Sequence, residues 1–338
     1  MELPRVDVHA LVDPTSSADD RLAVGRELDA ACRSCGFLLV AGHGVDPALR
    51  ADLERLSREF FALPDEEKAL IAMPRAGSAW RGWFPVGGEL TSGEPDRKEG
   101  VYFGTEFPAD DPRVRAGTPL HGANLFPERP ADLGPVVLRW IDEVSALGAA
   151  LLRGLALGLG LDEDWFARTL TADPTILFRA FHYPPGDTDS WGVGEHTDYG
   201  LITLLAQDHH GGLQVRSQGE WIDVPADPDV FVVNIGDMLD RMTRGRYRSD
   251  PHRVRNLSGQ DRVSFPLFVD PSWDARVTAL PDSVFEGEAP DDDAGSRWDG
   301  ASVHAWDGAY GDYLTAKVSR VFPDLFADVA SPSAPPAV

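Results

Sequence analysis

Two side chains that bind metal ions stand two residues apart in the segment Glu195-His-Thr-Asp-Tyr-Gly200. On extended backbone, residues i and i+2 point to the same side, so we expect His196 and Asp198 to face one point. An imidazole and a carboxylate that converge there would bind a divalent cation. A third ligand has to come from another segment, and His252 in Asp250-Pro-His-Arg-Val254 is the candidate.

This set of two histidines and one carboxylate fits two metals. In non-haem iron(II) oxygenases such a set occupies one face of an octahedron and leaves three positions open for small ligands and O2. Catalytic zinc sites also use three protein ligands and a water, so a zinc hydrolase fits the same residues. The spacing of the three side chains does not separate the iron and zinc hypotheses.

A basic and a hydroxyl side chain follow on a predicted strand, in Arg262-Val-Ser264. The two side chains face the same side of an extended chain. A guanidinium beside a hydroxyl forms a receptor for a carboxylate, and the guanidinium is suited to bidentate contact. A hydrolase has no general need of such a receptor, whereas an enzyme that holds a dicarboxylic cosubstrate by its far end does.

Together, these segments resemble the iron(II)/2-oxoglutarate dioxygenases of the isopenicillin N synthase-like family. The resemblance covers most of the chain, and a string of this length is more specific than three metal ligands. The matching segments are Leu3-Pro-Arg-Val-Asp7, Gly36-Phe-Leu-Leu-Val-Ala-Gly-His-Gly44, Phe60-Phe-Ala-Leu-Pro64 with Lys68, Arg81-Gly-Trp83, Asp96-Arg-Lys-Glu99, Tyr183-Pro-Pro185 and His196-Thr-Asp-Tyr-Gly-Leu-Ile-Thr-Leu204.

The resemblance implies a mixed α/β fold with a mainly β core, a double-stranded β-helix (a jelly-roll, cupin-like barrel) with flanking helices. It implies Fe(II) held by His196, Asp198 and His252, with no catalytic residue beyond these ligands. It further implies that Arg262 and Ser264, helped by Tyr183, hold the C5 carboxylate of 2-oxoglutarate. The expected reaction uses O2 to hydroxylate, desaturate or cyclise a small organic molecule, which would suit specialised metabolism.

One position departs from the family pattern. Plant members of the family commonly carry an asparagine two residues before the tyrosine of the Tyr-Pro-Pro turn, and this chain has Phe181 there. A contact to 2-oxoglutarate is therefore expected to be missing or replaced. Isopenicillin N synthase itself keeps the Arg-x-Ser motif without using 2-oxoglutarate, so an oxidase that needs only O2 is the alternative.

The substrate pocket is the least defined part of the site. By resemblance to the family layout, its expected lining is Arg81, Trp83, Phe103, Arg179, Trp191 and Phe268. Two arginines among aromatic rings indicate an acidic small molecule, although either arginine would equally serve in an ion pair. The identity of the substrate and the choice among the three reaction outcomes stay open at this level.

The elements that must position these residues follow from hydrophobic periodicity and turn signals. Short β-rich runs separated by turn residues favour a barrel or sandwich, and no Gly-rich nucleotide-binding loop occurs. Residues 74–135, rich in Gly, Pro and charges, are expected to be long ordered loops near the active site. The predicted helices are 18–35, 46–61, 64–70, 135–159 and 162–171, and the predicted strands are 5–8, 36–40, 176–183, 201–205, 213–215, 221–224, 231–235, 252–255 and 263–268.

This order of elements predicts one oxygenase domain over residues 1–330. We divide it into an N-terminal helical and loop region (1–130), a helix plus β-helix core with the metal site (131–280) and a C-terminal helical segment (281–330). Residues 331–338 are expected to be a tail.

Composition and charge limit the partners. The formal net charge is −24, from 55 acidic and 31 basic residues, so phosphate backbones and anionic membranes are repelled. The first residues lack the basic and apolar pattern of a signal peptide, and no apolar run is long enough to span a membrane. We therefore expect a cytoplasmic enzyme that binds a small molecule and neither nucleic acid nor membrane, with its oligomeric state undetermined.

Several other metal-binding residue types are expected to be structural. Cys32 and Cys35 close a helix and have no second ligand pair nearby, so neither a zinc nor a redox site is favoured. His43 matches a structural histidine of the family. His182 should point away from the pocket, and the pair 209–210 lies in a predicted exposed turn.

Overall fold

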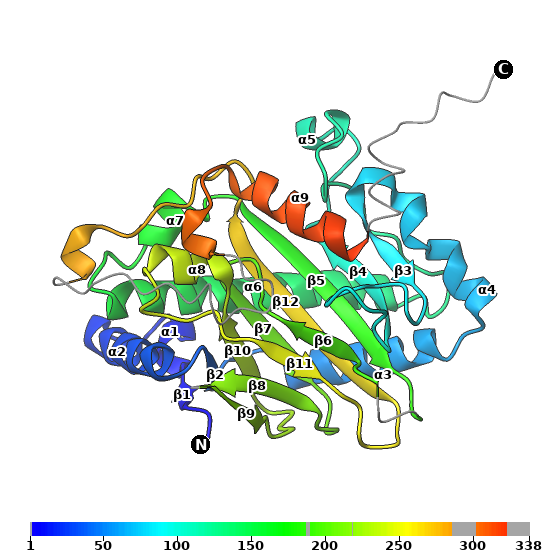
Figure 1. Cartoon of the computed structure of the whole chain (residues 1–338), viewed down its shortest axis with the longest axis horizontal. Helices are drawn as coiled ribbons and strands as arrows, with labels where there is room; N and C mark the ends of the chain where they lie inside the picture. The colour runs from blue at the N-terminus through cyan, green and yellow to red at the C-terminus, as the bar shows by residue number, and fades with distance from the viewer. Residues whose placement is uncertain (1, 187–189, 218, 286–301, 323–338) are drawn as a thin grey trace.

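Two β-sheets that face each other form the centre of the molecule (Figure 1). The structure is a computed structural model that describes residues 2–186, 190–217, 219–285 and 302–322. The larger sheet has eight strands in the order β1-β2-β10-β7-β12-β5-β4-β3, and the smaller has four in the order β6-β11-β8-β9. This arrangement is the predicted double-stranded β-helix with flanking helices, and the fold class is confirmed.

The strands of the larger sheet pair mostly in antiparallel fashion; β1 with β2 is parallel. Their bounds are β1 (Arg5–Asp7), β2 (Phe37–Ala41), β3 (Gly82–Phe84), β4 (Glu99–Gly104), β5 (Pro174–Tyr183), β7 (Ile202–Gln207), β10 (Phe231–Ile235) and β12 (Arg262–Ser272). The smaller sheet contains β6 (Val193–His196), β8 (Leu213–Ser217), β9 (Glu220–Asp223) and β11 (His252–Val254).

Helices cover the outer side of the larger sheet and one end of the molecule. Their bounds are α1 (His9–Val12), α2 (Ala18–Ser34), α3 (Pro47–Phe61), α4 (Asp65–Lys68), α5 (Pro112–Arg115), α6 (Leu133–Gly158), α7 (Trp165–Thr169), α8 (Asp237–Met242) and α9 (Tyr310–Val321). The predicted start of α3 is confirmed, because the Asp46 side chain accepts a hydrogen bond from the Ala48 amide with Pro47 at the first turn.

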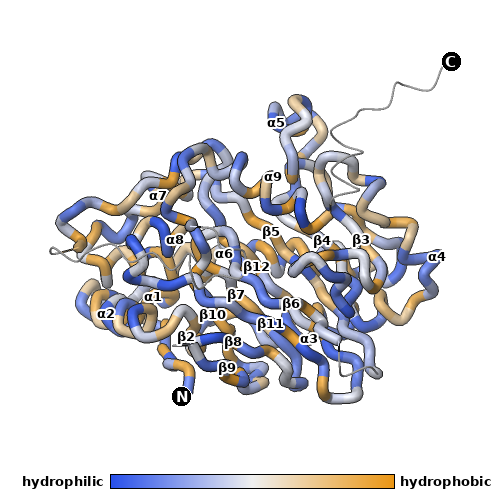
Figure 2. Tube along the Cα trace, viewed as in Figure 1, coloured by the Kyte–Doolittle hydropathy of each residue, from blue (hydrophilic) through white to orange (hydrophobic). Residues whose placement is uncertain are grey.

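The long helix α6 packs directly against the outer face of the larger sheet. A Cβ atom at Gly148 would lie 2.6 Å from Cγ2 of Val269 on β12, so only glycine permits this close approach. The buried apolar side chains form one continuous cluster that extends from Leu3 to Phe322, the last of the described residues. Figure 2 shows hydrophobic colour along central strands such as β5 and β10.

The prediction that residues 74–135 are loops was wrong in part. This region contributes β3 and β4 to the edge of the larger sheet, and every residue of β4 is buried. The β4 sequence mixes Glu99 and two glycines with apolar residues, so it lacks a clear alternating pattern. The glycine at position 100 is required by packing, because a Cβ there would lie 2.7 Å from the Phe181 ring.

Two further expectations concern membrane-spanning helices and the C-terminal part of the chain. No helix among the described residues is both long enough and apolar enough to cross a membrane. The predicted tail, residues 331–338, lies outside the described part of the chain, and the C-terminal helical segment is represented there by α9.

Candidate active site

A cavity between the two sheets collects most of the residues with predicted chemical roles. Strands β2, β5, β7, β10 and β12 of the larger sheet form one wall, β6, β8 and β11 of the smaller sheet the other, and α9 lies at one end. It encloses about 1020 Å³ of space, open solvent at its mouth included. The metal-ligand candidates, the Arg-x-Ser motif and Tyr183 all line this cavity.

Strand pairing brings the three metal-ligand candidates together. His196 at the end of β6 lies directly opposite His252 at the start of β11 in the antiparallel ladder. The Nε2 atom of each imidazole is 3.8 Å from Oδ1 of Asp198, and the two ring centroids are 4.0 Å apart. This is the cluster of potential metal ligands found among the described residues, and one ligand atom of each residue lies within 4.8 Å of the others.

Neighbouring groups fix the orientation of these ligands. Nδ1 of His196 donates to the Gly194 carbonyl oxygen at 2.8 Å, which leaves the Nε2 lone pair for a metal. Oδ2 of Asp198 accepts from Oγ1 of Thr203 at 2.5 Å and from Nδ2 of Asn234 at 2.8 Å. The other carboxylate oxygen, Oδ1, is thereby free to face the two imidazoles.

The electrostatics favour the protonation states that metal ligands require. Burial, together with the nearby His196, lowers the pKa of His252 to about 3, so this imidazole is neutral at physiological pH. Burial alone would raise the pKa of Asp198, but the two imidazoles and its hydrogen bonds outweigh that effect and lower it. A neutral His252 imidazole and an ionised Asp198 carboxylate fit a divalent cation such as Fe(II).

We predict that Asn234→Ala weakens metal binding about 10- to 100-fold, because Asp198 loses one of two hydrogen bonds that fix its orientation. Titration of the metal-free protein with Mn(II) would measure the dissociation constant. Gln214→Ala is a matched control, since its amide donates to Asp223 on the neighbouring strand. Equal affinities for the Asn234 variant and wild type would show that Thr203 alone orients the carboxylate.

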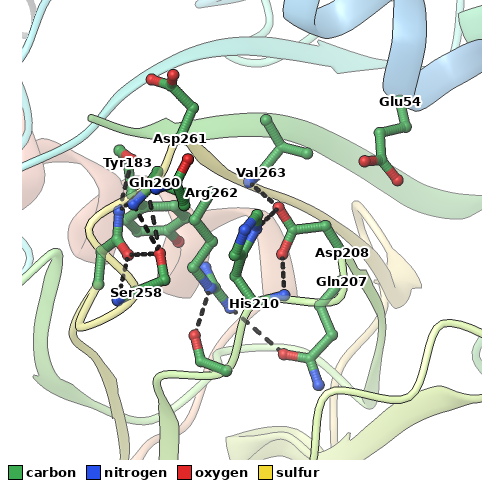
Figure 3. A network of polar contacts seen from close by, with 12 residues as sticks. Glu54, Tyr183, Gln207, Asp208, His210, Ser258, Gln260, Asp261, Arg262 and Val263 are labelled. Atoms are coloured by element: carbon green, nitrogen blue, oxygen red, sulfur yellow. Dashed lines mark hydrogen bonds and ion pairs between the residues drawn. The ribbon is translucent and has the colours of Figure 1, made fainter. Parts of the chain in front are cut away.

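Arg262 is fully buried, and two of its three guanidinium nitrogens donate hydrogen bonds within the protein (Figure 3). Its Nε donates to the Gly211 carbonyl oxygen at 3.0 Å and its Nη2 to Oε1 of Gln207 at 3.3 Å. Its Nη1 has no hydrogen-bond partner among the described residues. Burial of an unsatisfied guanidinium nitrogen is unfavourable, so a ligand carboxylate is its natural partner.

Ser264 and Tyr183 lie beside this guanidinium. Tyr183 pairs with Arg262 across strands β5 and β12, and the guanidinium lies 4.6 Å from the centroid of the Tyr183 ring. The Tyr183 hydroxyl is 3.3 Å from Oγ of Ser264. Two hydroxyl groups and one guanidinium therefore share the end of the cavity where a carboxylate would bind.

Two of the six residues expected in the substrate pocket line the cavity, namely Arg179 and Phe268. The Arg179 guanidinium lies 3.5 Å from the centroid of the Tyr102 ring and 5.0 Å from that of Phe268. Its Nη1 atom is buried and has no hydrogen-bond partner among the described residues.

The other four residues of that expectation do not line this cavity. The Arg81 side chain donates to the Leu120 carbonyl oxygen, and the Trp83 indole donates to Glu99. The Phe103 ring stacks between Phe126 and Phe178, and Trp191 has the guanidinium groups of Arg253 and Arg255 near its ring. These partners keep the four side chains within other parts of the structure.

Sequence reasoning missed several cavity residues. Charged and hydroxyl groups among them come from distant segments, and apolar ones come from α9 and the residue that follows it. They include Glu89, Lys98, Tyr102, Tyr199, Asp270, Leu314, Val318, Val321 and Phe322. Alternation along β12 could have identified Asp270, because Arg262, Ser264, Pro266 and Phe268 face the same side.

His182 and both cysteines have structural surroundings, as expected. His182 contacts the carboxylates of Glu99 and Asp261, each at 2.8 Å, and does not line the cavity. Cys32 and Cys35 are free and buried, and burial raises the pKa of both thiols. The reactive thiolate form is therefore disfavoured.

Of the two turn histidines that were expected to be exposed, one is exposed and the other is half-buried with a protein partner, and the Gly-His-Gly histidine also has protein partners. Nδ1 of His210 is 3.1 Å from Oδ2 of Asp208 (Figure 3), whereas His209 is exposed. The Val45 amide donates to Nδ1 of His43, whose ring packs edge-on against Phe231.

Comparison with known proteins places this site in a family. Residues 3–129 match the family described as non-haem dioxygenase in morphine synthesis N-terminal, and residues 174–271 match the 2OG-Fe(II) oxygenase superfamily. A probable iron/ascorbate oxidoreductase of Dictyostelium discoideum is 44% identical over 96% of both chains. A 1-aminocyclopropane-1-carboxylate oxidase of the same organism is 34% identical, again over 96% of both chains.

A solved structure agrees with these relatives. A full-length protein of Neurospora crassa, crystallised in complex with alpha-KG and thymine, has a TM-score of 0.76 and 26% identity over 94% of this chain and 96% of that one. These likenesses do not favour the alternative of an oxidase without 2-oxoglutarate. The chain belongs to the 2OG-Fe(II) oxygenase superfamily and is a dioxygenase that uses Fe(II), 2-oxoglutarate and O2 to oxidise a small molecule.

Proposed function

We propose that His196, Asp198 and His252 hold the iron and that Arg262, with Ser264 and Tyr183, binds the C5 carboxylate of 2-oxoglutarate. The observation that supports this assignment best is the buried Nη1 atom of Arg262, which has no protein partner among the described residues and belongs to the same cavity lining as the three ligands. A dicarboxylate would reach from this guanidinium toward the metal site.

The protein's own part in the reaction is binding, orientation and exclusion of water. When bound, iron and 2-oxoglutarate supply the oxidising power, with O2 consumed and succinate and CO2 released. Arg262 fixes one end of the cosubstrate, so that its other end is presented to the metal ligands. Apolar side chains of α9, among them Leu314 and Val318, close one end of the cavity and exclude water.

We further propose that the substrate is an acidic small molecule bound beside Arg179 and Phe268. Arg179 is buried against two aromatic rings and keeps one nitrogen without a protein partner among the described residues, so an anionic group of a ligand would complete its contacts. The similar oxidase of Dictyostelium is named for 1-aminocyclopropane-1-carboxylate, which is itself a carboxylic acid.

Several broader features of the enzyme also belong to this proposal. The continuous core supports a single oxygenase domain over residues 1–330, with the 131–280 portion carrying the site. The N-terminal family match and the shared sequence segments support a member of the isopenicillin N synthase-like branch. A cytoplasmic location and the absence of nucleic-acid and membrane partners stay predictions.

The proposal is tested by iron content and by succinate release that depends on a second substrate. Purified protein reconstituted with Fe(II) should bind 2-oxoglutarate anaerobically, with a visible charge-transfer band. Under air, candidate acids should increase succinate formation above the uncoupled rate. A protein that binds iron but shows no spectral response to 2-oxoglutarate would contradict the cosubstrate assignment.

Tyr183→Phe is predicted to weaken 2-oxoglutarate binding about two- to twelve-fold. One neutral hydrogen bond contributes about 0.5–1.5 kcal/mol, and the phenolic hydroxyl lies 3.3 Å from Ser264 at the carboxylate end. Anaerobic titration of the Fe(II) protein gives the dissociation constant. An unchanged constant would remove Tyr183 from the cosubstrate site.

Phe181→Asn is predicted to tighten 2-oxoglutarate binding, because the Phe181 ring lines the cavity where the family commonly has an amide. Phe181→Leu is the matched control, since it removes the aromatic ring without adding a hydrogen-bond donor. The same titration compares both variants with wild type. Tightening in the leucine variant as well would assign the effect to space and not to the amide.

A further inference from the structure

Two neighbouring strands line the cavity in a regular order that separates its two ends. On β5, the residues facing the cavity are Leu177, Arg179, Phe181 and Tyr183, and on β12 they are Arg262, Ser264, Pro266, Phe268 and Asp270. Tyr183 pairs with Arg262 and Leu177 with Phe268, so the two rows run side by side in opposite directions. Arg262 therefore marks the cosubstrate end, and Phe268 and Asp270 lie toward the other end.

Buried polar atoms that lack a hydrogen-bond partner indicate which ligand groups would fit the cavity. Among the described residues, five buried side-chain atoms in its lining have no hydrogen-bond partner. They are Oε2 of Glu89, Nη1 of Arg179, Nδ1 of His252, Nη1 of Arg262 and Oδ1 of Asp270. Arg262 belongs to the proposed cosubstrate site, and His252 is a proposed metal ligand through its other ring nitrogen. The Glu89 oxygen has the Lys98 ammonium 2.9 Å away.

The two remaining groups carry opposite charges. Arg179 offers a donor and Asp270 an acceptor, and no ion pair joins these two side chains in the described structure. Both residues are buried, with 8% and 2% of their surface exposed. Burying these two polar atoms without hydrogen-bond partners is costly, so a ligand that bonds to both is favoured.

Asp270 is held with one oxygen bonded and one free. Its Oδ2 accepts from the Tyr310 hydroxyl at 2.6 Å, and a Cβ atom at Gly200 would lie 1.5 Å from its Oδ1. Gly200 follows the metal-ligand segment, so the free oxygen packs against the backbone beside Asp198. Burial, together with the charge of Asp198, raises the pKa of Asp270 to about 7, although the Tyr310 hydrogen bond and the Arg179 charge act in the opposite direction.

We propose that the substrate is dipolar, with an anionic group bound by Arg179 and a cationic nitrogen bound by Asp270, as in an amino acid. This inference rests on the proposed function, because it takes the cavity as the substrate site. It adds Asp270 as a residue that determines specificity, and it extends the acidic substrate class to compounds that carry both charges.

The test uses four small probes with the same six-carbon chain. L-Norleucine and 6-aminohexanoate carry both charges, hexanoate carries only the anion, and 1-aminohexane carries only the cation. Calorimetry on protein loaded with Mn(II) and 2-oxoglutarate measures binding without turnover. At least one dipolar probe should bind about tenfold or more tightly than both single-charge probes, since a hydrogen bond to a charged group contributes about 1.5–3 kcal/mol.

Two variants separate the roles of the charges. Asp270→Asn should bring the affinity for the preferred dipolar probe down to that for hexanoate, whose own binding stays unchanged. Arg179→Met should bring the affinity for the preferred dipolar probe down to the affinity for 1-aminohexane. Tyr310→Phe is the matched control: it removes a hydrogen bond from Asp270 but keeps the carboxyl group. The preference for a dipolar probe should therefore remain when binding is measured well above pH 7, where Asp270 is ionised.

Each outcome is decisive. The proposal is overturned if no probe binds, if dipolar and single-charge probes bind equally, or if Asp270→Asn keeps the dipolar preference. The affinity for 2-oxoglutarate should match wild type in all three variants. Failure of the wild-type protein to bind 2-oxoglutarate would instead contradict the proposed function. The failure of the proposal and the failure of the proposed function are therefore distinguishable.

Discussion

Replacing His252 with alanine is expected to abolish turnover and iron binding while the protein stays folded. The imidazole lies opposite His196 and 3.8 Å from the Asp198 carboxylate, so its removal takes away one of three converging ligands. Loss of groups that merely orient ligands costs about 10- to 100-fold, and loss of a ligand should exceed that range. The measurements are iron stoichiometry, kcat and far-ultraviolet circular dichroism.

The fold should survive because the sheets are held by backbone pairing and apolar packing, in which His252 contributes one edge-on contact with Phe37. His209→Ala is the matched control, since this exposed histidine lies in a turn outside the cavity. The control should keep wild-type iron content and kcat. A His252→Ala protein with wild-type iron content and turnover would refute the ligand assignment.

Arg262→Ala is expected to raise the KM for 2-oxoglutarate about thirty-fold or more, with iron affinity unchanged. Removing one partner of a buried, hydrogen-bonded charge pair costs about 2–5 kcal/mol, which corresponds to at least that factor. Arg262→Lys keeps the positive charge but loses the planar arrangement of donors, so it should recover only part of the affinity. Succinate formation at varied 2-oxoglutarate concentrations gives KM and kcat.

Arg55→Ala provides the control for loss of an arginine, because Arg55 is exposed on α3 with Asp52 and Glu59 as its partners. Its KM should equal that of wild type. Thermal unfolding of both Arg262 variants checks that the cavity wall remains intact. If Arg262→Ala needed no more 2-oxoglutarate than wild type, the guanidinium would have another role, such as binding the oxidised substrate.

Much of the fold follows from local sequence alone. Hydrophobic periodicity predicted α2, α3 and α6, and short β-rich runs between turn signals predicted β5, β7 and β10. These elements bury a face whose pattern is visible in sequence. The strands β3 and β4 escaped prediction, because Gly100 and the buried Glu99 obscure the pattern and their pairing with β5 stabilises them.

The chemistry of the site was determined largely by residue type and spacing. Arg262 and Ser264 fall on one face of β12, and the spacing of two residues keeps His196 and Asp198 close together although β6 ends at His196. That local rule holds because side chains alternate along every strand. The pairing of His252 with His196 needed β11 to lie beside β6, which the sequence only suggested through family resemblance.

Only the tertiary structure determines which residues line the substrate end of the cavity. Arg81 and Arg179 look alike in sequence, yet Arg81 donates to the Leu120 carbonyl oxygen outside the cavity while Arg179 faces into it. Asp270, the loop residue Glu89 and the α9 residue Val318 meet there from distant parts of the chain. A local pattern specifies which side of an element is buried, but the partners it meets depend on sheet order and on how loops and helices close over the barrel.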